Sequence, residues 1–176
     1  LLENSGGSMK MVATDGHRLA LITREGVSVD SVNKESVLLP RKGVMEMKKV
    51  LDEKEGPFLL GITQKNAVMK RENTVIIIRL LEGEFPDYTR VIPKDNDKDA
   101  IAVRAELLSS LKRVSLLSTD KIKGVKFSFS NSKLVLSSSS PDIGDATEEV
   151  DIEYPFGELE IAFNARYFVD MLEALS

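Results

Sequence analysis

The side chains that could perform chemistry in this chain are few and lie far apart. The single histidine, His17, follows Asp15 and Gly16 in what reads as a turn, and a lone histidine beside a turn is usually a surface or capping residue. The sequence contains no Gly-x-Ser-x-Gly elbow, no His-Glu-x-x-His pair and no phosphate-binding loop. A hydrolase that used His17 and Asp15 would therefore lack a nucleophile–base pattern, and the sequence favours a binding protein.

One group of carboxylates could hold a hard cation such as calcium or magnesium. Asp142, Asp145, Glu148 and Glu149 lie in and beside a loop predicted at 139–147. Because metal sites without a spacing pattern are rare, a solvated acidic loop is the favoured interpretation. The chain has no cysteine, which excludes a disulfide framework and a thiolate metal site. We expect no metal and no cofactor.

Basic side chains gather in two places that could contact nucleic acid. The first group lies on a helix predicted from residue 42 and the second on and after the next helix: Arg41, Lys42, Lys48, Lys49, and Arg104, Lys112, Arg113, Lys121, Lys123. Such faces can follow phosphates without reading base sequence, although an ordinary solvated helix face is the alternative. The net charge of −4 argues against a plain nucleic-acid-binding module, but it allows a surface that is basic on one side.

The elements that must position these residues are many short strands and a few helices. Hairpins are predicted at Asp15-Gly16, between strands at 10–14 and 17–22, and at Asn131-Ser132, between strands at 124–130 and 134–138. Helical spacing predicts helices from 42 until Gly56-Pro57, at 106–117 and from the N-cap Asn164. Further short strands are predicted at 36–39, 58–62, 66–70, 74–81, 100–103, 149–152 and 158–163, and a loop at 82–94. Without regular strand–helix–strand alternation, this order predicts an α+β protein with antiparallel sheets.

The length of 176 residues allows one ordinary domain or two small ones, and a weak internal repeat favours two. The strand at 10–14 resembles the segment at 133–137, and Val44, Met47 and Leu51 correspond to Phe168, Met171 and Leu175 at nearly the same offset. Two copies of one module would explain this pattern. Chance similarity between amphipathic elements is the alternative. The sequence has no run of apolar residues long enough to predict a membrane span.

Four motifs carry a resemblance to a known family. The first two are Met11-Val12-Ala13-Thr14-Asp15-Gly16-His17-Arg18-Leu19-Ala20 and Glu84-Phe85-Pro86-Asp87-Tyr88-Thr89-Arg90-Val91-Ile92-Pro93-Lys94. The other two are Thr119–Val125 and Phe163–Tyr167. With these motifs in this order, the chain resembles the bacterial DNA sliding clamps, the beta subunits of DNA polymerase III, over essentially its whole length.

The resemblance implies a DNA-clamp fold, with repeated domains, antiparallel sheets on the outside and helices lining an inner face. It assigns residues 1–96 to the C-terminal part of the second, central domain. It assigns 97–176 to the third, C-terminal domain, truncated before its last strands. Both ends of the chain also read as cut, since Leu1 is not a methionine and the helical pattern at 171–176 has no cap. We therefore expect a fragment that cannot close the family's head-to-tail ring of two subunits.

The resemblance also implies a function without catalysis. The clamp encircles duplex DNA regardless of sequence, makes the polymerase processive and docks linear peptides of polymerases, clamp loader and repair proteins. By motif, the peptide-binding cleft would comprise Thr14, Gly16, His17, Arg18, Leu19, Pro86, Arg90, Val91, Ile122, Asn164 and Tyr167. Its apolar members would form the pocket and Thr14, Arg18 and Arg90 would hold the peptide's polar groups, although core packing is the alternative for Leu19.

The remaining implied sites concern DNA and the second subunit. Residues expected to face DNA are Arg41, Lys42, Lys48, Lys49, Lys112 and Arg113. Leu116 and Leu117 correspond to the place where the third domain meets the next subunit of the homodimer. The family implies a cytoplasmic, nucleoid-associated protein without a catalytic residue, a metal or a cofactor.

Overall fold

The computed structural model describes residues 1–5, 7–26, 30–31, 36–53, 55–117 and 124–175. The chain forms two compact units, Leu1–Ile92 and Pro93–Ser176, which are described separately below. Among the described residues, no helix is long and apolar enough to cross a membrane. The units combine antiparallel sheets with helices, which confirms the predicted α+β class.

The first sheet of unit 1 carries the hairpin predicted around Asp15 and Gly16. It contains β1 (Leu2–Ser5), β2 (Ser8–Thr14), β3 (Leu19–Glu25) and β5 (Ser36–Val37), in the order β3-β2-β1-β5. All its strand pairs are antiparallel. The return strand β3 begins at Leu19 and not at His17 as predicted, because His17 and Arg18 belong to the turn.

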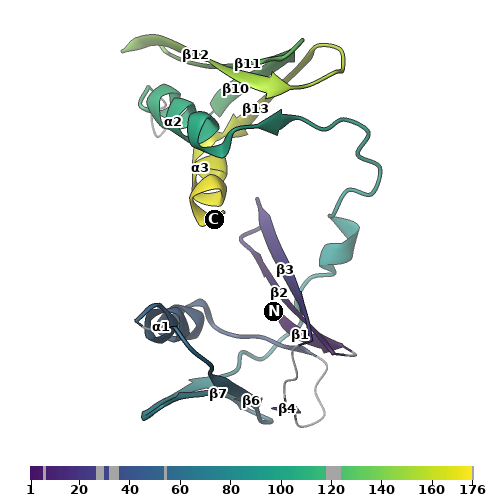
Figure 1. The fold of residues 1–176 in the computed structure, drawn as a ribbon, viewed down its shortest axis with the longest axis vertical. Coiled ribbons are helices and arrows are strands. Elements are labelled where there is room, and N and C mark those ends of the chain that lie inside the picture. The colour runs from purple at the N-terminus through teal and green to yellow at the C-terminus, as the bar shows by residue number, and fades with distance from the viewer. Residues whose placement is uncertain (6, 27–29, 32–35, 54, 118–123, 176) are drawn as a thin grey trace. The chain divides into compact units, whose positions relative to one another are not determined.

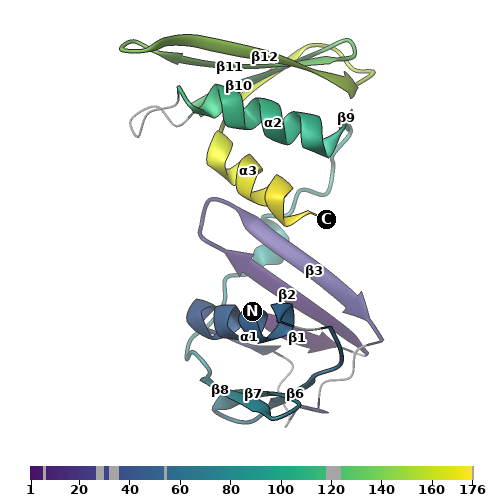
Figure 2. The same cartoon turned by 60° about the vertical axis from the view of Figure 1, so that its left-hand side comes forward.

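The second sheet of unit 1 is packed against one helix. It contains β4 (Asp30–Ser31), β6 (Leu59–Ile62), β7 (Asn66–Arg71) and β8 (Thr74–Arg79), and only the short β4–β6 pair among these strands is parallel. Helix α1 (Arg41–Asp52) lies beside this sheet (Figure 2). Met47 from α1 joins Met69 and Ile78 in the core. Beyond β8, the loop predicted at 82–94 contains a short 3-10 helix, η1 (Tyr88–Arg90).

Unit 2 is one five-stranded sheet with two helices on the same face (Figures 1 and 2). Its elements are β9 (Ile101–Ala102), α2 (Arg104–Ser115), β10 (Gly124–Ser130), β11 (Lys133–Ser140), β12 (Gly144–Glu153), β13 (Leu159–Asn164) and α3 (Ala165–Ala174). The strand order is β13-β10-β11-β12-β9. Leu111 and Val114 of α2 are fully buried with Phe127 and Leu136 of the sheet.

The prediction of a loop at 139–147 is wrong, because most of this stretch belongs to two paired strands. Strand β11 continues to Ser140, β12 starts at Gly144, and the two strands stay paired up to Ser140 and Gly144. Ser138 and Ser140 are buried on this hairpin. The run of serines suggested a loop because serine side chains form local hydrogen bonds with the backbone that compete with strand pairing. In this hairpin, pairing between the two strands outweighs that local preference.

The internal repeat is visible as a repeated topology. In unit 1 the strands are ordered β3-β2-β1-β5 and α1 follows β5, whereas in unit 2 they are ordered β12-β11-β10-β13 and α3 follows β13. Each helix starts directly after its cap, Pro40 or Asn164, in the register predicted from the sequence. The alignment of the strands differs from the predicted one by two residues. Counted from the preceding turn, Leu134 of β11 is equivalent to Met9 of β2, whereas the sequence repeat had aligned it with Met11.

Candidate functional site

The turn between β2 and β3 is built by its own side chains. Thr14 donates its hydroxyl to the Arg18 carbonyl (2.8 Å) and accepts from the Gly16 amide (3.1 Å). One carboxylate oxygen of Asp15 accepts from the amides of His17 and Arg18, and the other accepts from the Arg18 Nε, all at 3.1 Å. Gly16 has φ +86°, a conformation that costs other residues free energy. This turn therefore presents His17 and Arg18 on a fixed, exposed frame.

Asp15 is held in its charged form by the same contacts. The pKa of its carboxyl is lowered, first by the hydrogen bond from the His17 amide and further by the Arg18 amide and guanidinium. A protonated Asp15 would accept these bonds less well. Asp15 thus organises the turn, and its short contacts with Arg18 do not make a nucleophile–base pair.

One face of the first sheet carries several of the predicted site residues. Strand pairing places Glu3 opposite Lys10, Val12 opposite Leu21 and Thr14 opposite Leu19. Because side chains alternate between faces along a strand, these six residues share one face. Thr14 is exposed, Leu19 is half-buried and Leu21 retains 43% of its accessible surface. Leu19 is therefore not an ordinary core residue.

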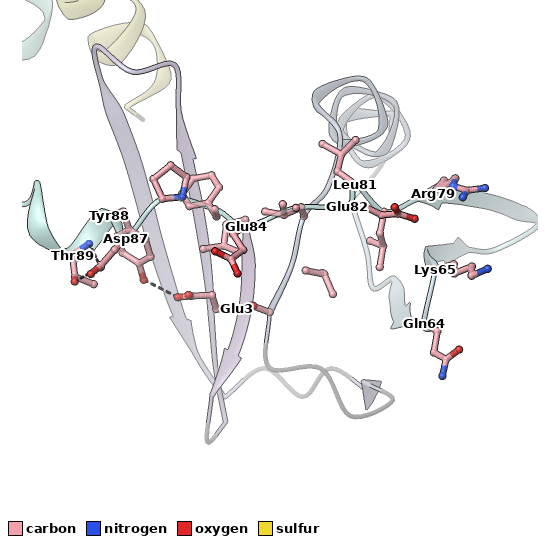
Figure 3. Close-up of a pocket in the computed structure, with 18 residues that line it drawn as sticks. Glu3, Gln64, Lys65, Arg79, Leu81, Glu82, Glu84, Asp87, Tyr88 and Thr89 are labelled. Carbon is pink, nitrogen blue, oxygen red and sulfur yellow. Dashed lines mark hydrogen bonds between the residues drawn. The ribbon is translucent and has the colours of Figure 1, made fainter.

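The loop after β8 is attached to this same face. The Tyr88 hydroxyl donates to Glu3 Oε2 at 2.7 Å, and the two residues are joined by a dashed line in Figure 3. Tyr88 is buried, whereas Pro86 and Arg90 are exposed and Val91 keeps 67% of its surface accessible. The loop thus lies on the face that carries Thr14 and Leu19, with Pro86 and Val91 open to solvent.

Local contacts also fix the shape of this loop. Asp87 caps η1 by accepting from the Thr89 amide (3.2 Å) and hydroxyl (2.6 Å), and it accepts from the Arg90 Nε at 2.8 Å. Phe85 packs edge-on against Tyr88 with ring centroids 6.4 Å apart. The surface formed by Thr14, Leu19, Leu21, Pro86 and Val91 is called the hairpin–loop surface below. It combines exposed apolar groups with two arginines at its turns.

The predicted cleft residues of unit 2 lie at the start of α3. The Asn164 side chain caps this helix by accepting from the Arg166 amide at 3.1 Å, as the sequence predicted. Tyr167 is half-buried on the first turn of the helix. Ile122 lies outside the described residues, as do the basic residues Lys121 and Lys123. For Asn164 the helix cap alone explains the residue type.

The basic residues predicted to face DNA in unit 1 lie on the exposed side of α1. Arg41, Lys42, Lys48 and Lys49 are all exposed, and the buried Met47 is on the opposite side. Lys49 pairs with Glu46 at 2.9 Å and Lys48 with Asp52 at 3.7 Å. Such exposed pairs contribute little to stability, so they leave the lysines available for other anions.

In unit 2 the two basic residues predicted to face DNA are tied to neighbouring elements. Arg113 of α2 donates to both carboxylate oxygens of Glu148 on β12, at 2.8 and 2.6 Å, and also to Ser110. Lys112 pairs with Glu173 of α3. Arg113 therefore has a structural function whatever else it binds. Leu116, predicted at a subunit contact, is 80% exposed, and Leu117 is half-buried.

The acidic group expected in a flexible loop lies mostly on a strand. Asp145, Glu148 and Glu149 belong to β12, where Glu148 binds Arg113 and Glu149 binds Lys133. Within the described parts of the chain, no group of three or more His, Asp or Glu residues is arranged to hold a metal ion. The carboxylates on this strand mainly neutralise nearby cations.

Unit 1 also contains a groove that the sequence did not predict. It has a volume of about 650 Å³ and lies between β5 and the chain at 79–89 (Figure 3). Glu3, Lys65, Glu82 and Glu84 are among its lining residues, and Pro86 is the member of the predicted cleft that reaches it. Its lining combines part of the Glu84–Lys94 motif with segments far apart in the sequence, such as Leu1, Ser36 and Lys65, so the motif alone did not reveal the groove.

Each unit contains a sheet with the same strand order, followed in the chain by a helix, α1 or α3. This repeated arrangement is the architecture of a clamp-fold protein. Solved structures agree: the DNA polymerase sliding clamp of Pseudomonas aeruginosa matches 99% of this chain with a TM-score of 0.90 at 34% identity. The DNA polymerase III beta subunit of Thermotoga maritima matches 99% with a TM-score of 0.87 at 30% identity. This chain covers 48% and 47% of those two chains.

Family models identify the family itself. The model for the central domain of the DNA polymerase III beta subunit matches residues 1–87, and the model for its C-terminal domain matches residues 89–176. The chain belongs to the DNA polymerase III beta subunit family. Relatives named beta sliding clamp are 36% identical over 172 residues in Pseudomonas aeruginosa and 37% identical over 176 in Escherichia coli K12. The chain spans 47% of the length of each.

Proposed function

We propose that this chain is part of a DNA sliding clamp, a non-catalytic processivity factor that docks linear peptides of its partner proteins. The observation that carries the proposal is the hairpin–loop surface of unit 1. There Leu19 and Leu21 share a face with the loop that exposes Pro86 and Val91. Exposed apolar side chains held on a rigid frame, with polar groups beside them, suit a short peptide with apolar anchors.

A relative supports the idea of a ligand site in this family. A sliding clamp of Pseudomonas aeruginosa has been solved bound to griselimycin, and it matches this chain with a TM-score of 0.87 at 34% identity. For this chain, we expect the partners to be clamp-binding peptides of polymerases, clamp loader and repair proteins. All the assignments to the peptide cleft stay predictions, including those of Ile122, Asn164 and Tyr167 in the second unit.

The proposal also gives the basic helices a function. Exposed Arg41, Lys42, Lys48 and Lys49 on α1 would make loose, sequence-independent contacts with duplex DNA, and Lys112 of α2 would add to them. Arg113 contributes only if its bidentate bond to Glu148 opens. In the longer protein, Leu116 and Leu117 would meet a second subunit in a closed homodimeric ring, in the cytoplasm and on the nucleoid.

The two units would then be parts of the second and third clamp domains. The predicted boundary between residues 96 and 97 lies close to the division between the compact units. On this proposal residues 1–96 complete the central domain and residues 97–176 begin the C-terminal one. A ring would need the remaining half of the longer protein.

Peptide titration tests the proposal. A fluorescent peptide of the glutamine-leucine-x-leucine-phenylalanine type should bind the chain, and its anisotropy should rise to saturation. Leu19→Lys and Pro86→Lys should each abolish the rise, because docking would bury the new lysine against an apolar anchor of the peptide, which is costly. Leu59→Lys is the matched control, since Leu59 is 71% exposed on the second sheet, and it should bind like the unmodified chain. Unchanged binding by both test variants would contradict the assigned surface.

A further inference from the structure

A long-range hydrogen bond between Tyr88 and Glu3 anchors the loop that exposes Pro86 and Val91. We propose that Tyr88 is a positioning residue for peptide docking: bound to Glu3, it fixes the loop so that Pro86 and Val91 stand beside Leu19. The inference rests on the proposed function, because it concerns the same hairpin–loop surface. It assigns a role to two residues that the sequence motifs had not placed in the site.

The geometry separates anchor residues from contact residues within one short loop. Tyr88 is 9% exposed and Phe85 is half-buried, whereas Pro86 is exposed and Val91 is 67% exposed. The aromatic pair faces into the unit and the residues beside it face out. A docking residue needs to be accessible, so Tyr88 acts through the loop and not by touching a peptide.

The Tyr88–Glu3 bond links the loop to the first sheet. It joins residues 85 positions apart at 2.7 Å and is partly buried. The contacts of Asp87 with Thr89 and Arg90 lie within one turn and fix the shape of η1. Glu3 lies opposite Lys10 on the face that also carries Thr14 and Leu19, so the bond fixes the loop relative to that face.

In the Tyr88–Glu3 hydrogen bond, the tyrosine is the donor and the glutamate is the acceptor. The hydrogen bond to Glu3 raises the pKa of Tyr88 above its ordinary value, so the phenol stays protonated and donates. A carboxylate acceptor makes this a charge-assisted bond, stronger than a neutral one. A loop held in its binding conformation before the peptide arrives does not lose further conformational freedom on binding. Removing the bond should therefore weaken docking even though no peptide contact is deleted.

A mutant cycle tests the proposal in the same peptide titration. Tyr88→Phe keeps the ring and its packing but removes the donor, and Glu3→Ala removes the acceptor. Each should weaken peptide binding by about fivefold, the order that one hydrogen bond contributes. The double variant should bind no more weakly than either single variant, since both delete one bond. Glu3→Gln retains an acceptor oxygen and should restore most of the affinity.

Thermal unfolding of each variant, measured without peptide, separates positioning from general stability. Titrations run far below the unfolding transition should still show the loss of affinity, which a purely structural role would not produce. Full affinity in Tyr88→Phe, or additive losses in the double variant, would overturn the positioning role while the proposed function stands. If the unmodified chain and the Leu59→Lys control fail to bind, the proposed function itself has failed.

Discussion

Arg113 and Glu148 show how a single residue pair ties a helix to a sheet. The guanidinium makes two hydrogen bonds to the carboxylate, at 2.8 and 2.6 Å, and a third to Ser110. These contacts lower the pKa of Glu148, with the hydrogen bond from Arg113 as the largest cause. The pair joins α2 to β12 across 35 positions of sequence, so it supports the fold of unit 2 whatever α2 binds.

The lowered pKa predicts how the pair responds to acid. Because the folded state has the lower pKa, the unfolded chain binds the proton more readily, and stability from this pair is lost as pH falls. The stabilisation is complete above the ordinary glutamate value of 4.5 and disappears as pH drops through the lowered pKa. The difference in unfolding free energy between the chain and Glu148→Gln should therefore be largest near neutral pH and shrink in acid.

Urea unfolding over a pH series measures this difference. Arg113→Met is the matched control, because it deletes the other half of the pair and should show the same convergence with the unmodified chain. A difference that stays constant through the acid range would mean that the charge of Glu148 does not stabilise the fold.

The residue types of this pair were visible in the sequence, but their partnership was not. Arg113 looked like part of a basic face and Glu148 like part of an acidic loop. Only the packing of α2 against β11 and β12 brings them together. By contrast, the Asn164 cap and the hairpin at Asp15-Gly16 depend on local residue types, so the sequence predicted both, although the turn extends to Arg18.

At the scale of elements, α1 approaches β8 closely at one glycine. A Cβ added at Gly43 would lie 2.5 Å from the Cγ2 of Ile78, which is 4% exposed. In a helix, alanine is normally favoured over glycine by about 1 kcal/mol. Here the clash should reverse the sign, because overpacking a buried contact costs about 1–3 kcal/mol.

A double-mutant cycle with denaturant unfolding tests this contact. Gly43→Ala should destabilise the chain by about 1 kcal/mol net. In an Ile78→Ala background, where the obstructing atoms are gone, the same change should become stabilising. If Gly43→Ala stabilised the unmodified chain, the helix would not be as close to β8 as the structure has it.

Elements with strong local signals were predictable, and elements set by pairing were not. Helices α1, α2 and α3 followed from apolar spacing, and both hairpins followed from their turn residues. The polar Ser139–Thr147 stretch was assigned to a loop, although pairing between β11 and β12 extends through it. The repeat gave the right helix register, but strands permit shifted alignments because their alternating pattern recurs at every second residue.

In both units an arginine side chain binds carbonyl groups at the end of a helix, a contact that the sequence did not predict. Arg71 of β7 donates to the Val50 and Leu51 carbonyls at the end of α1, and Arg104 donates to the Leu172 carbonyl near the end of α3. Both arginines satisfy carbonyls that a helix end leaves without partners. The two helices occupy equivalent places in the repeat, yet their arginines come from different elements.

At the scale of the whole molecule, the sequence motifs led to the family, and folding explains why those motifs recur together. Thr14–Leu19 and Pro86–Val91 are separated in sequence, but the Tyr88–Glu3 bond attaches the second segment to the sheet face of the first. The groove beside β5 and the anchoring function of Glu3 came only from the structure. Both depend on contacts between distant segments, which one sequence cannot display.

The central claim is that the hairpin–loop surface receives a peptide, and amide chemical-shift mapping tests it most directly. The labelled chain would be titrated with the glutamine-leucine-x-leucine-phenylalanine peptide while backbone amide shifts are followed. We predict that the largest shifts fall on Thr14–Leu19 and on Tyr88–Val91, with smaller ones along β3. Shifts confined to the groove around Lys65 and Glu82, or no shifts at saturating peptide, would contradict the account.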